Sequence, residues 1–324
     1  MKKKIMIIHT GGTISMSEDE QTGAVTPGER NPLTTIPLVV DSNIHIESHE
    51  LFNLPSPHIT SQHMLLLSKF IDQQAMEHGI EGFVVTHGTD TLEETAFFLD
   101  LTVQTRVPIV LTGAMRSSNE IGSDGPYNLL SSVKVAASEE AKNKGVLVVL
   151  NDEVHTAKNV TKTHTSNIAT FQSPQYGPIG IVTKRGAFFH HSPVSEDKYQ
   201  VDSVTKNVML LKAYAGMDSS IFHALKDMQV DGVILEALGQ GNIPPTAVEG
   251  IKSLREANIP VVMVSRCFNG IVQDIYGYEG GGRRLKELGV IFSNGLNGQK
   301  ARIKLMVALE STIDPDKLQE LFLR

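Results

Sequence analysis

The stretch IMIIHTGGTI (Ile5–Ile14) joins a short run of apolar residues to a polar turn that contains a glycine pair. Three more apolar runs also end in small polar residues: GFVV at 82–85, PIVL at 108–111 and VLVVL at 146–150. Stretches of helical character lie between these runs, at about residues 60–77, 92–102 and 125–143. Strands that are apolar throughout and alternate with helices are typical of a parallel sheet covered on both faces. The pattern therefore predicts an α/β fold.

The chain has 324 residues, which exceeds the usual size of a single hydrophobic core. Near residues 191–207 the alternation gives way to polar, irregular sequence of the kind found in linkers. Strand and helix patterns resume beyond it. We predict a larger N-terminal domain at 1–190 with a parallel sheet of flavodoxin-like, Rossmann-like type. A linker at 191–212 and a smaller C-terminal α/β domain at 213–324 would follow.

Composition excludes several classes of protein. The formal net charge is −7, and Lys2–Lys4 is the only dense basic run, so a nucleic-acid partner is not expected. No apolar run approaches the ~18 residues of a membrane span, and Ile5–Ile8 is too short for the core of a signal peptide. Cys267 is the only cysteine, which excludes an intrachain disulfide. These features predict a cytoplasmic protein that does not bind membranes.

Motifs for common cofactors are also missing from the sequence. It contains no GxxxxGK[ST] phosphate loop, no GxGxxG after a strand, no GxSxG elbow and no HExxH metal motif. The 12 histidines are scattered along the chain and do not have the spacing of metal ligands. We therefore expect no metal and no organic cofactor, and a nucleotide-binding Rossmann protein is disfavoured.

Threonines gather where the predicted strands end. In open α/β sheets, ligands bind beyond the carboxyl ends of the strands. The threonines at or near those ends are Thr10, Thr13, Thr86, Thr89, Thr91, Thr112, Thr161 and Thr163. A threonine hydroxyl is a weak nucleophile that needs a base, and a lysine in a pocket loses its proton more readily than a free one.

Lys162 follows the VLVVL strand within the sequence VTKT, and it is the candidate base. Asp90 would orient this lysine or bind a substrate ammonium, while the backbone N–H groups near Gly12 and Gly88 would bind an oxyanion. Together these residues indicate acyl transfer with a threonine nucleophile. The competing interpretation is structural: threonines often cap helices, Asp90 would be the N-cap of the following helix, and Lys162 would lie on the surface.

Several longer segments resemble the bacterial L-asparaginases, a family of homotetrameric amidohydrolases. The segments that carry the resemblance are HTGGTI at 9–14, THGTDTLEET at 86–95, TGAMR at 112–116, SDGPYNLL at 123–130 and NDEVHTAKNVTKTHT at 151–165. The resemblance continues through FQSPQYGPIG at 171–180, GQGN at 239–242 and GQKAR at 298–302, and so covers nearly the whole chain.

The resemblance implies the hydrolysis of L-asparagine without a cofactor, and it implies a role for each matching residue. Thr13 would be the nucleophile that attacks the side-chain amide carbon. Thr89, Asp90 and Lys162 would form a second cluster, in which Lys162 helps to deprotonate Thr89 or the attacking water. Asp90 would also bind the substrate α-amino group.

The remaining implied roles concern substrate binding and assembly. Ser56 would bind the substrate α-carboxylate, and the backbone near Thr89 and Ala114 would line the amide side. The C-terminal domain of a neighbouring subunit would complete each site, with Asn242 and Glu279 as the candidate residues. The resemblance thus implies a homodimer or homotetramer with active sites shared between subunits.

Two positions depart from the family pattern. The family usually has a tyrosine on a mobile lid, but the corresponding residues 15–30 contain none, and Ala24 or Val25 stands near its expected place. This leaves open whether another residue, a bound water or the Lys162 cluster activates Thr13. Pro57 occupies the place of a glutamine that contacts substrate in several relatives, and proline has no N–H and no polar side chain. We therefore expect low glutaminase activity.

Three alternatives stay open at the level of sequence. Glutaminase-asparaginases share the same pattern. An amidase subunit acting on misacylated tRNA is disfavoured, because it needs a surface that faces RNA and this chain is acidic. A protein that binds an amino acid but has lost turnover would also fit the missing lid tyrosine.

Overall fold

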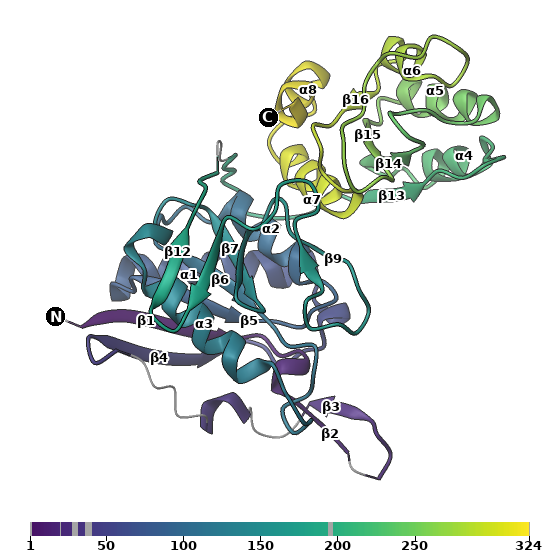
Figure 1. The fold of residues 1–324 in the computed structure, drawn as a ribbon. Helices are drawn as coiled ribbons and strands as arrows, with labels where there is room; N and C mark the ends of the chain where they lie inside the picture. The colour runs from purple at the N-terminus through teal and green to yellow at the C-terminus, as the bar shows by residue number, and fades with distance from the viewer. Residues whose placement is uncertain (1, 20, 28–31, 36–40, 194–196, 324) are drawn as a thin grey trace. The chain divides into compact units, whose positions relative to one another are not determined.

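The structure is a computed structural model that describes residues 2–19, 21–27, 32–35, 41–193 and 197–323. It contains two compact units, residues 1–198 and 199–324, which are treated separately below (Figure 1). The α/β fold class and the division into a larger and a smaller sheet agree with the prediction from sequence. No helix among the described residues is long and apolar enough to span a membrane.

The first unit is built on an eight-stranded sheet with the order β12-β11-β8-β7-β6-β5-β1-β4. Five neighbouring strands run parallel: β4 (Ile44–Glu50), β1 (Lys3–His9), β5 (Gly82–Thr86), β6 (Ile109–Thr112) and β7 (Val146–Leu150). The other three are antiparallel to their neighbours: β8 (Glu153–Thr156), β11 (Gly180–Thr183) and β12 (Gly186–Phe189). A tight turn reverses the chain between β7 and β8, because Asn151 and Asp152 have φ of 50° and 63°.

The apolar strands are buried on both faces because alternate side chains point to opposite sides of the sheet. Along β1, Met6 and Ile8 pack into the core that contains residues of α1 (Ser61–His78) and α2 (Leu92–Thr102). Ile5 and Ile7 pack into the core that contains residues of α3 (Gly125–Ala137). The sheet is thus sandwiched between helices, as continuous apolar strands require.

One predicted helix is shorter in the structure than in the prediction. The helix expected at 125–143 ends at Ala137, and a separate 3₁₀ turn, η4 (Glu139–Ala141), follows it. Ser138 has extended backbone between the two, and its hydroxyl accepts a hydrogen bond from the Glu140 N–H at 3.3 Å. The serine therefore ends one helix and caps the next turn.

The second unit has a four-stranded parallel sheet with the order β13-β14-β15-β16. Its strands are β13 (Val208–Lys212), β14 (Gly232–Ala237), β15 (Val261–Ser265) and β16 (Ile291–Phe292). Its helices are α4 (Ser220–Asp227), α5 (Val248–Glu256), α6 (Gly282–Glu287), α7 (Gly298–Leu309) and α8 (Pro315–Leu323). The expected linker at 191–212 overlaps this unit, because residues 208–212 form the edge strand β13.

Candidate active site

The carboxyl ends of β1, β5 and β6 are tied together by their backbone. The N–H of Thr10 donates to the carbonyl of Thr86 at 3.1 Å, and the N–H of His87 donates to the carbonyl of Thr112 at 2.8 Å. The polar segments that follow these strands, 10–13, 87–91 and 113–116, therefore begin side by side. This is the edge of a parallel sheet at which ligands bind.

Several threonines at this edge have structural roles. The hydroxyl of Thr10 donates to the Thr86 carbonyl at 2.8 Å, and that of Thr112 donates to the Val149 carbonyl at 2.7 Å. Thr163 bonds the Thr170 carbonyl in the same way, at 2.8 Å. Their hydroxyls are used to satisfy buried backbone groups, as the structural interpretation expects. These three threonines are therefore not candidates for catalysis, and the other threonines at the strand ends remain candidates.

Glycines allow two of the segments to touch. Gly12 has φ 86° and ψ 174°, a conformation that only glycine adopts readily. A β-carbon at Gly12 would lie 2.2 Å from the backbone N and Cα of Gly88. A β-carbon at Gly88 would in turn lie 2.8 Å from the Ser56 side chain. The segments around residues 12, 56 and 88 thus form one packed unit at van der Waals distance.

Thr13 follows Gly12 and begins the short 3₁₀ turn η1 (Thr13–Ser15). It is partly exposed, and no described residue hydrogen-bonds its side chain. Its neighbour Gly12 contacts Gly88, the residue immediately before Thr89. The structure therefore brings the segment of Thr13 to the segment of Thr89, although 76 positions separate the two threonines in the sequence.

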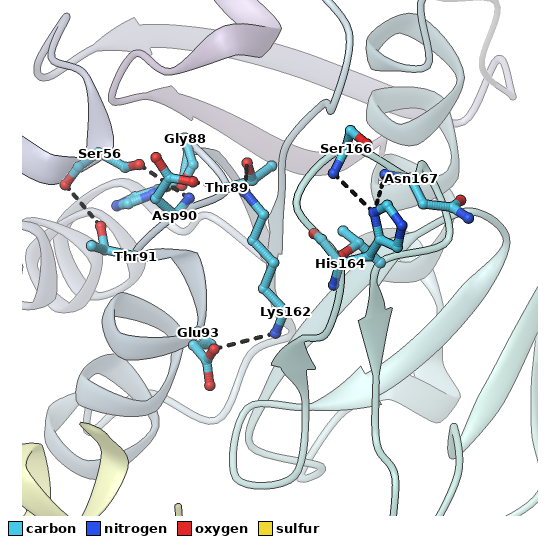
Figure 2. A network of polar contacts seen from close by, with 12 residues as sticks. Ser56, Gly88, Thr89, Asp90, Thr91, Glu93, Lys162, His164, Ser166 and Asn167 are labelled. Carbon is cyan, nitrogen blue, oxygen red and sulfur yellow. Dashed lines mark hydrogen bonds and ion pairs between the residues drawn. The ribbon is translucent and has the colours of Figure 1, made fainter. Parts of the chain in front are cut away.

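Thr89, Asp90 and Lys162 form a hydrogen-bonded cluster (Figure 2). The Nζ of Lys162 donates to the Thr89 Oγ1 at 2.9 Å and to the Asp90 Oδ1 at 2.7 Å. Thr89 is buried and the Lys162 side chain is 16% exposed, whereas the Asp90 side chain is 62% exposed. The cluster therefore has an inner hydroxyl, a bridging ammonium and a carboxylate that is open to a ligand.

Lys162 is held in place by its backbone as well as its side chain. It lies in the short strand β9 (Thr161–Lys162), which pairs with β10 (Phe171–Gln172). The Oε1 of Glu93 accepts hydrogen bonds from the Thr161 hydroxyl at 2.9 Å and from the Lys162 N–H at 3.2 Å. Because Glu93 is buried in the first turn of α2, it fixes β9 to the helix that follows the Thr89 segment.

Ser56 connects to the same cluster. Its Oγ accepts a hydrogen bond from the Asp90 N–H at 3.2 Å, so its own hydroxyl proton remains available to a ligand. Its carbonyl accepts from the Thr91 hydroxyl at 2.8 Å. Thr91, and not Asp90, is the N-cap residue of α2. The alternative role of Asp90 as a helix cap is therefore wrong, and its carboxylate faces Lys162 instead.

The segment of Ala114 is held by an acidic side chain. Asp124 accepts hydrogen bonds from the N–H groups of Met115, at 3.0 Å, and Arg116, also at 3.0 Å. The amide of Asn128 donates to the Gly113 carbonyl at 3.0 Å. Ala114 itself is buried between these anchored residues. Its backbone thus lies at the end of β6. The segment of Thr89 is its neighbour, because the Thr89 side chain lies close to where a β-carbon of Gly113 would be.

Two family models match the chain over most of its length. Residues 4–195 match the family model "Asparaginase, N-terminal", and residues 207–322 match "Glutaminase/Asparaginase C-terminal domain".

The chain belongs to the asparaginase family.

The similarity of the chain to known relatives extends over almost its full length. A probable L-asparaginase of Deinococcus radiodurans is 37% identical over 98% of this chain and 97% of its own length. An L-asparaginase of Bacillus licheniformis is 34% identical over 96% of this chain and 97% of its own. L-asparaginase 2 of Escherichia coli is 34% identical over 98% of this chain and 92% of its own.

The two candidates in the second unit of this asparaginase-family chain lie in the loops that follow β14 and β15. Asn242 is partly exposed, and its Oδ1 accepts a hydrogen bond from the Gly282 N–H at 3.3 Å. Glu279 is exposed in the loop before α6. The structure describes each unit by itself, so the proximity of these residues to a threonine cluster stays a prediction. Among the described residues, no group of three or more His, Cys, Asp or Glu side chains is arranged to hold a metal.

Sequence reasoning missed Glu93, Asp124 and His87 as residues that shape the site. His87 is buried, its Nδ1 lies 2.8 Å from the Gly88 carbonyl, and its Nε2 lies 3.0 Å from the Thr95 Oγ1. A carbonyl only accepts, so Nδ1 carries the proton and Nε2 accepts from the threonine. Burial lowers the pKa of His87 to about 4 and thereby keeps the ring neutral. The only sequence signal was the position of His87 at a strand end, which it shares with many structural residues.

Two buried histidines should make stability depend on pH. Burial lowers the pKa of His9, like that of His87, from 6.5 to about 4. Below pH 6.5 the unfolded chain binds protons that the folded chain does not, so the free energy of unfolding should fall as pH drops from about 6.5 to 4. The loss is about 3 kcal/mol for each histidine.

Urea unfolding at pH 7, 6, 5 and 4.5 measures this dependence. The variant His87→Gln keeps a donor and an acceptor at the same place but does not titrate. Its free energy of unfolding should fall about half as steeply with pH, because His9 remains. Equal slopes in the variant and the parent would contradict the assignment of His87 as a neutral, buried group.

Proposed function

We propose that this protein hydrolyses L-asparagine to L-aspartate and ammonia. One observation carries the proposal within the asparaginase family: the Lys162 Nζ bridges a buried threonine hydroxyl and a solvent-exposed carboxylate. An amino-acid substrate presents an ammonium and a carboxylate, so a selective site needs one acidic group and hydroxyl or N–H donors. Asp90 and Ser56 supply these groups on adjoining segments.

In the proposed reaction, the Thr13 oxygen attacks the side-chain amide carbon of asparagine. Backbone N–H groups of the segments at residues 13 and 88–89 bind the developing oxyanion, because the N–H of Gly12 already donates to the Leu54 carbonyl at 3.1 Å. The C–N bond breaks, and the amide nitrogen leaves as ammonia with the proton that the Thr13 hydroxyl has given up. Water then attacks the acyl group on Thr13, and the bond between the acyl carbon and the Thr13 oxygen breaks. The proton of the water passes through the Lys162–Thr89 pair to the Thr13 oxygen, and aspartate is released.

Thr13 has to lose its proton without the lid tyrosine of the family. The expected lid at residues 15–30 includes the hairpin β2 (Met16–Glu18) and β3 (Val25–Pro27), while residues 20 and 28–30 lie outside the described part of the chain. Another residue, a bound water or the Lys162 cluster would take the Thr13 proton in place of a lid tyrosine. A lid of this kind keeps bulk water away from the bound substrate.

Ammonia release tests the proposed activity directly. Purified protein should release ammonia from L-asparagine, with a kcat/KM at least about tenfold higher than from L-glutamine. The expected preference arises because Pro57, exposed in η3 (Ser56–His58), offers no donor to position the longer side chain. The variant Pro57→Gln should narrow the ratio by raising the activity on glutamine.

Each other outcome of the assay has a definite meaning. Equal efficiencies on the two amides would refute the role of Pro57 and favour a glutaminase-asparaginase. No ammonia from either amide, together with a rise in melting temperature on adding asparagine, would identify a binding protein without turnover. The cytoplasmic location stays a prediction from the sequence, based on its single cysteine and its short apolar runs.

We also propose that the active sites are shared between subunits of a homodimer or homotetramer. The variants Lys162→Met and Asn242→Ala should each be nearly inactive alone. When they are unfolded, mixed in equal amounts and refolded, about a quarter of the sites should combine an intact first unit with an intact second unit from another chain. Recovery of ammonia release in the mixture would support sharing. A mixture as inactive as its components would contradict it.

A further inference from the structure

The first unit has a second cavity, at the sheet edge opposite the threonine cluster. Its volume is about 590 Å³, within the range of sites for small molecules. Lys3, at the start of β1, lines it, whereas the threonine cluster lies beyond His9 at the other end of that strand. Six residues of strand span about 20 Å. The cavity is therefore distinct from the candidate active site.

Four basic side chains line this cavity: Lys3, Lys134, Lys184 and Arg185. Lys134 comes from α3, and its Nζ donates to the Thr183 carbonyl at 3.2 Å, which ties the helix to the β11–β12 hairpin. Lys184 and Arg185 form the turn of that hairpin. The turn has a defined shape, because the Arg185 N–H donates to the Thr183 hydroxyl at 3.1 Å. Two adjacent cations are thus presented at one side of the cavity.

The lining has four basic side chains and one carboxylate, Asp41, so its charge is only partly balanced. Lys3 is neutralised by Glu139, whose Oε1 lies 2.7 Å from its Nζ. Among the described residues, no carboxylate lies within ion-pair distance of Lys134, Lys184 or Arg185. Like charges gathered at one concave surface repel one another and attract an anion.

The rest of the lining points to the size and kind of the anion. Ile44 and Leu130 provide apolar surface, and Asp41 and Asn43 provide a carboxylate and an amide. We propose that the cavity binds a nucleoside monophosphate. Lys184, Arg185 and Lys134 bind the phosphate, the apolar residues contact the base, and Asp41 accepts from an exocyclic amino group. Charge-assisted hydrogen bonds of this kind are the strong ones in phosphate recognition.

Titration calorimetry with adenosine monophosphate tests this proposal on the full chain at 0.15 M salt, where weak surface attraction is screened. The parent should bind one nucleotide per chain. The double variant Lys184→Gln/Arg185→Gln should bind at least about tenfold more weakly. The control Lys317→Glu makes the same change in net charge on an exposed lysine of α8 and should bind as the parent does. An unchanged melting temperature would show that the variants are folded.

Three results would overturn the proposal. The first is that adenosine monophosphate does not bind to the parent. The second is that the double variant at residues 184 and 185 and the control Lys317→Glu weaken its binding equally. The third concerns the ligand class: inorganic phosphate alone binding as tightly as the nucleotide would identify a simple anion site. Adenosine without phosphate should bind at least about tenfold more weakly than the nucleotide, because the three unpaired cations then have no partner. None of these measurements depends on the proposed asparaginase activity.

Discussion

Replacing Lys162 with methionine is expected to lower the kcat for ammonia release from L-asparagine by about 1,000-fold or more. Methionine is similar in length but removes both the charge and the N–H groups that reach Thr89 and Asp90. The protein should remain folded, because β9 is still held through the backbone N–H of residue 162 and Glu93. Steady-state ammonia release, with the melting temperature measured in parallel, checks both parts of this expectation.

A matched control and a double variant make the Lys162 experiment specific. Lys317→Met changes an exposed lysine of α8 in the same way and should leave kcat unchanged. Thr89→Val removes the hydroxyl that Lys162 contacts, and adding it to Lys162→Met should cost little more, because residues that act as a unit are not additive. Persistent activity of Lys162→Met with only a shifted pH profile would make Lys162 a structural partner of Asp90.

Replacing Gly12 with alanine is expected to lower kcat/KM by at least about 100-fold, although the new side chain is only a methyl group. The added carbon would lie 2.2 Å from the Gly88 backbone, and the φ of 86° disfavours any residue with a β-carbon. The collision moves either Thr13 or the segment of Thr89 and Asp90. Ammonia release and thermal unfolding measure the two consequences.

Gly79→Ala separates this displacement from simple backbone strain. Gly79 ends α1 with φ 64°, and a β-carbon there meets no atom within 4 Å. The control should therefore lose about 1 kcal/mol of stability from the left-handed conformation and keep its activity. If Gly12→Ala loses no more activity than Gly79→Ala, the close approach of residues 12 and 88 has no catalytic importance.

Much of the first unit was predictable because each local pattern agrees with the final fold. The strands expected at 82–85 and 146–150 are β5 and β7, and the helix expected at 92–102 is α2 with the same ends. The antiparallel strands β8, β11 and β12 were not expected. They are short and lie at one edge of the sheet, where pairing with a neighbour outweighs a weak local preference.

The site was only partly predictable. Ser56, Thr89, Asp90 and Lys162 were named from motifs and a family resemblance, and the structure joins them by hydrogen bonds. Glu93 was missed because an acidic residue in the first turn of a helix is favourable for that helix alone. Its burial against Thr161 and the Lys162 backbone depends on a segment 69 positions away.

The sequence by itself determined where strands end in glycine and threonine, and therefore which edge of the sheet has the chemistry. That information is local, because apolar periodicity and turn residues act over a few positions. The residue pattern left open which threonine meets the lysine; the family resemblance named Thr89, and the tertiary structure supplies the contact. Thr10 and Thr112 bond the backbone, whereas Thr89 faces a lysine 73 positions further along the chain. Such a contact depends on how β9 and α2 pack together through Glu93, and no pattern within either segment specifies it.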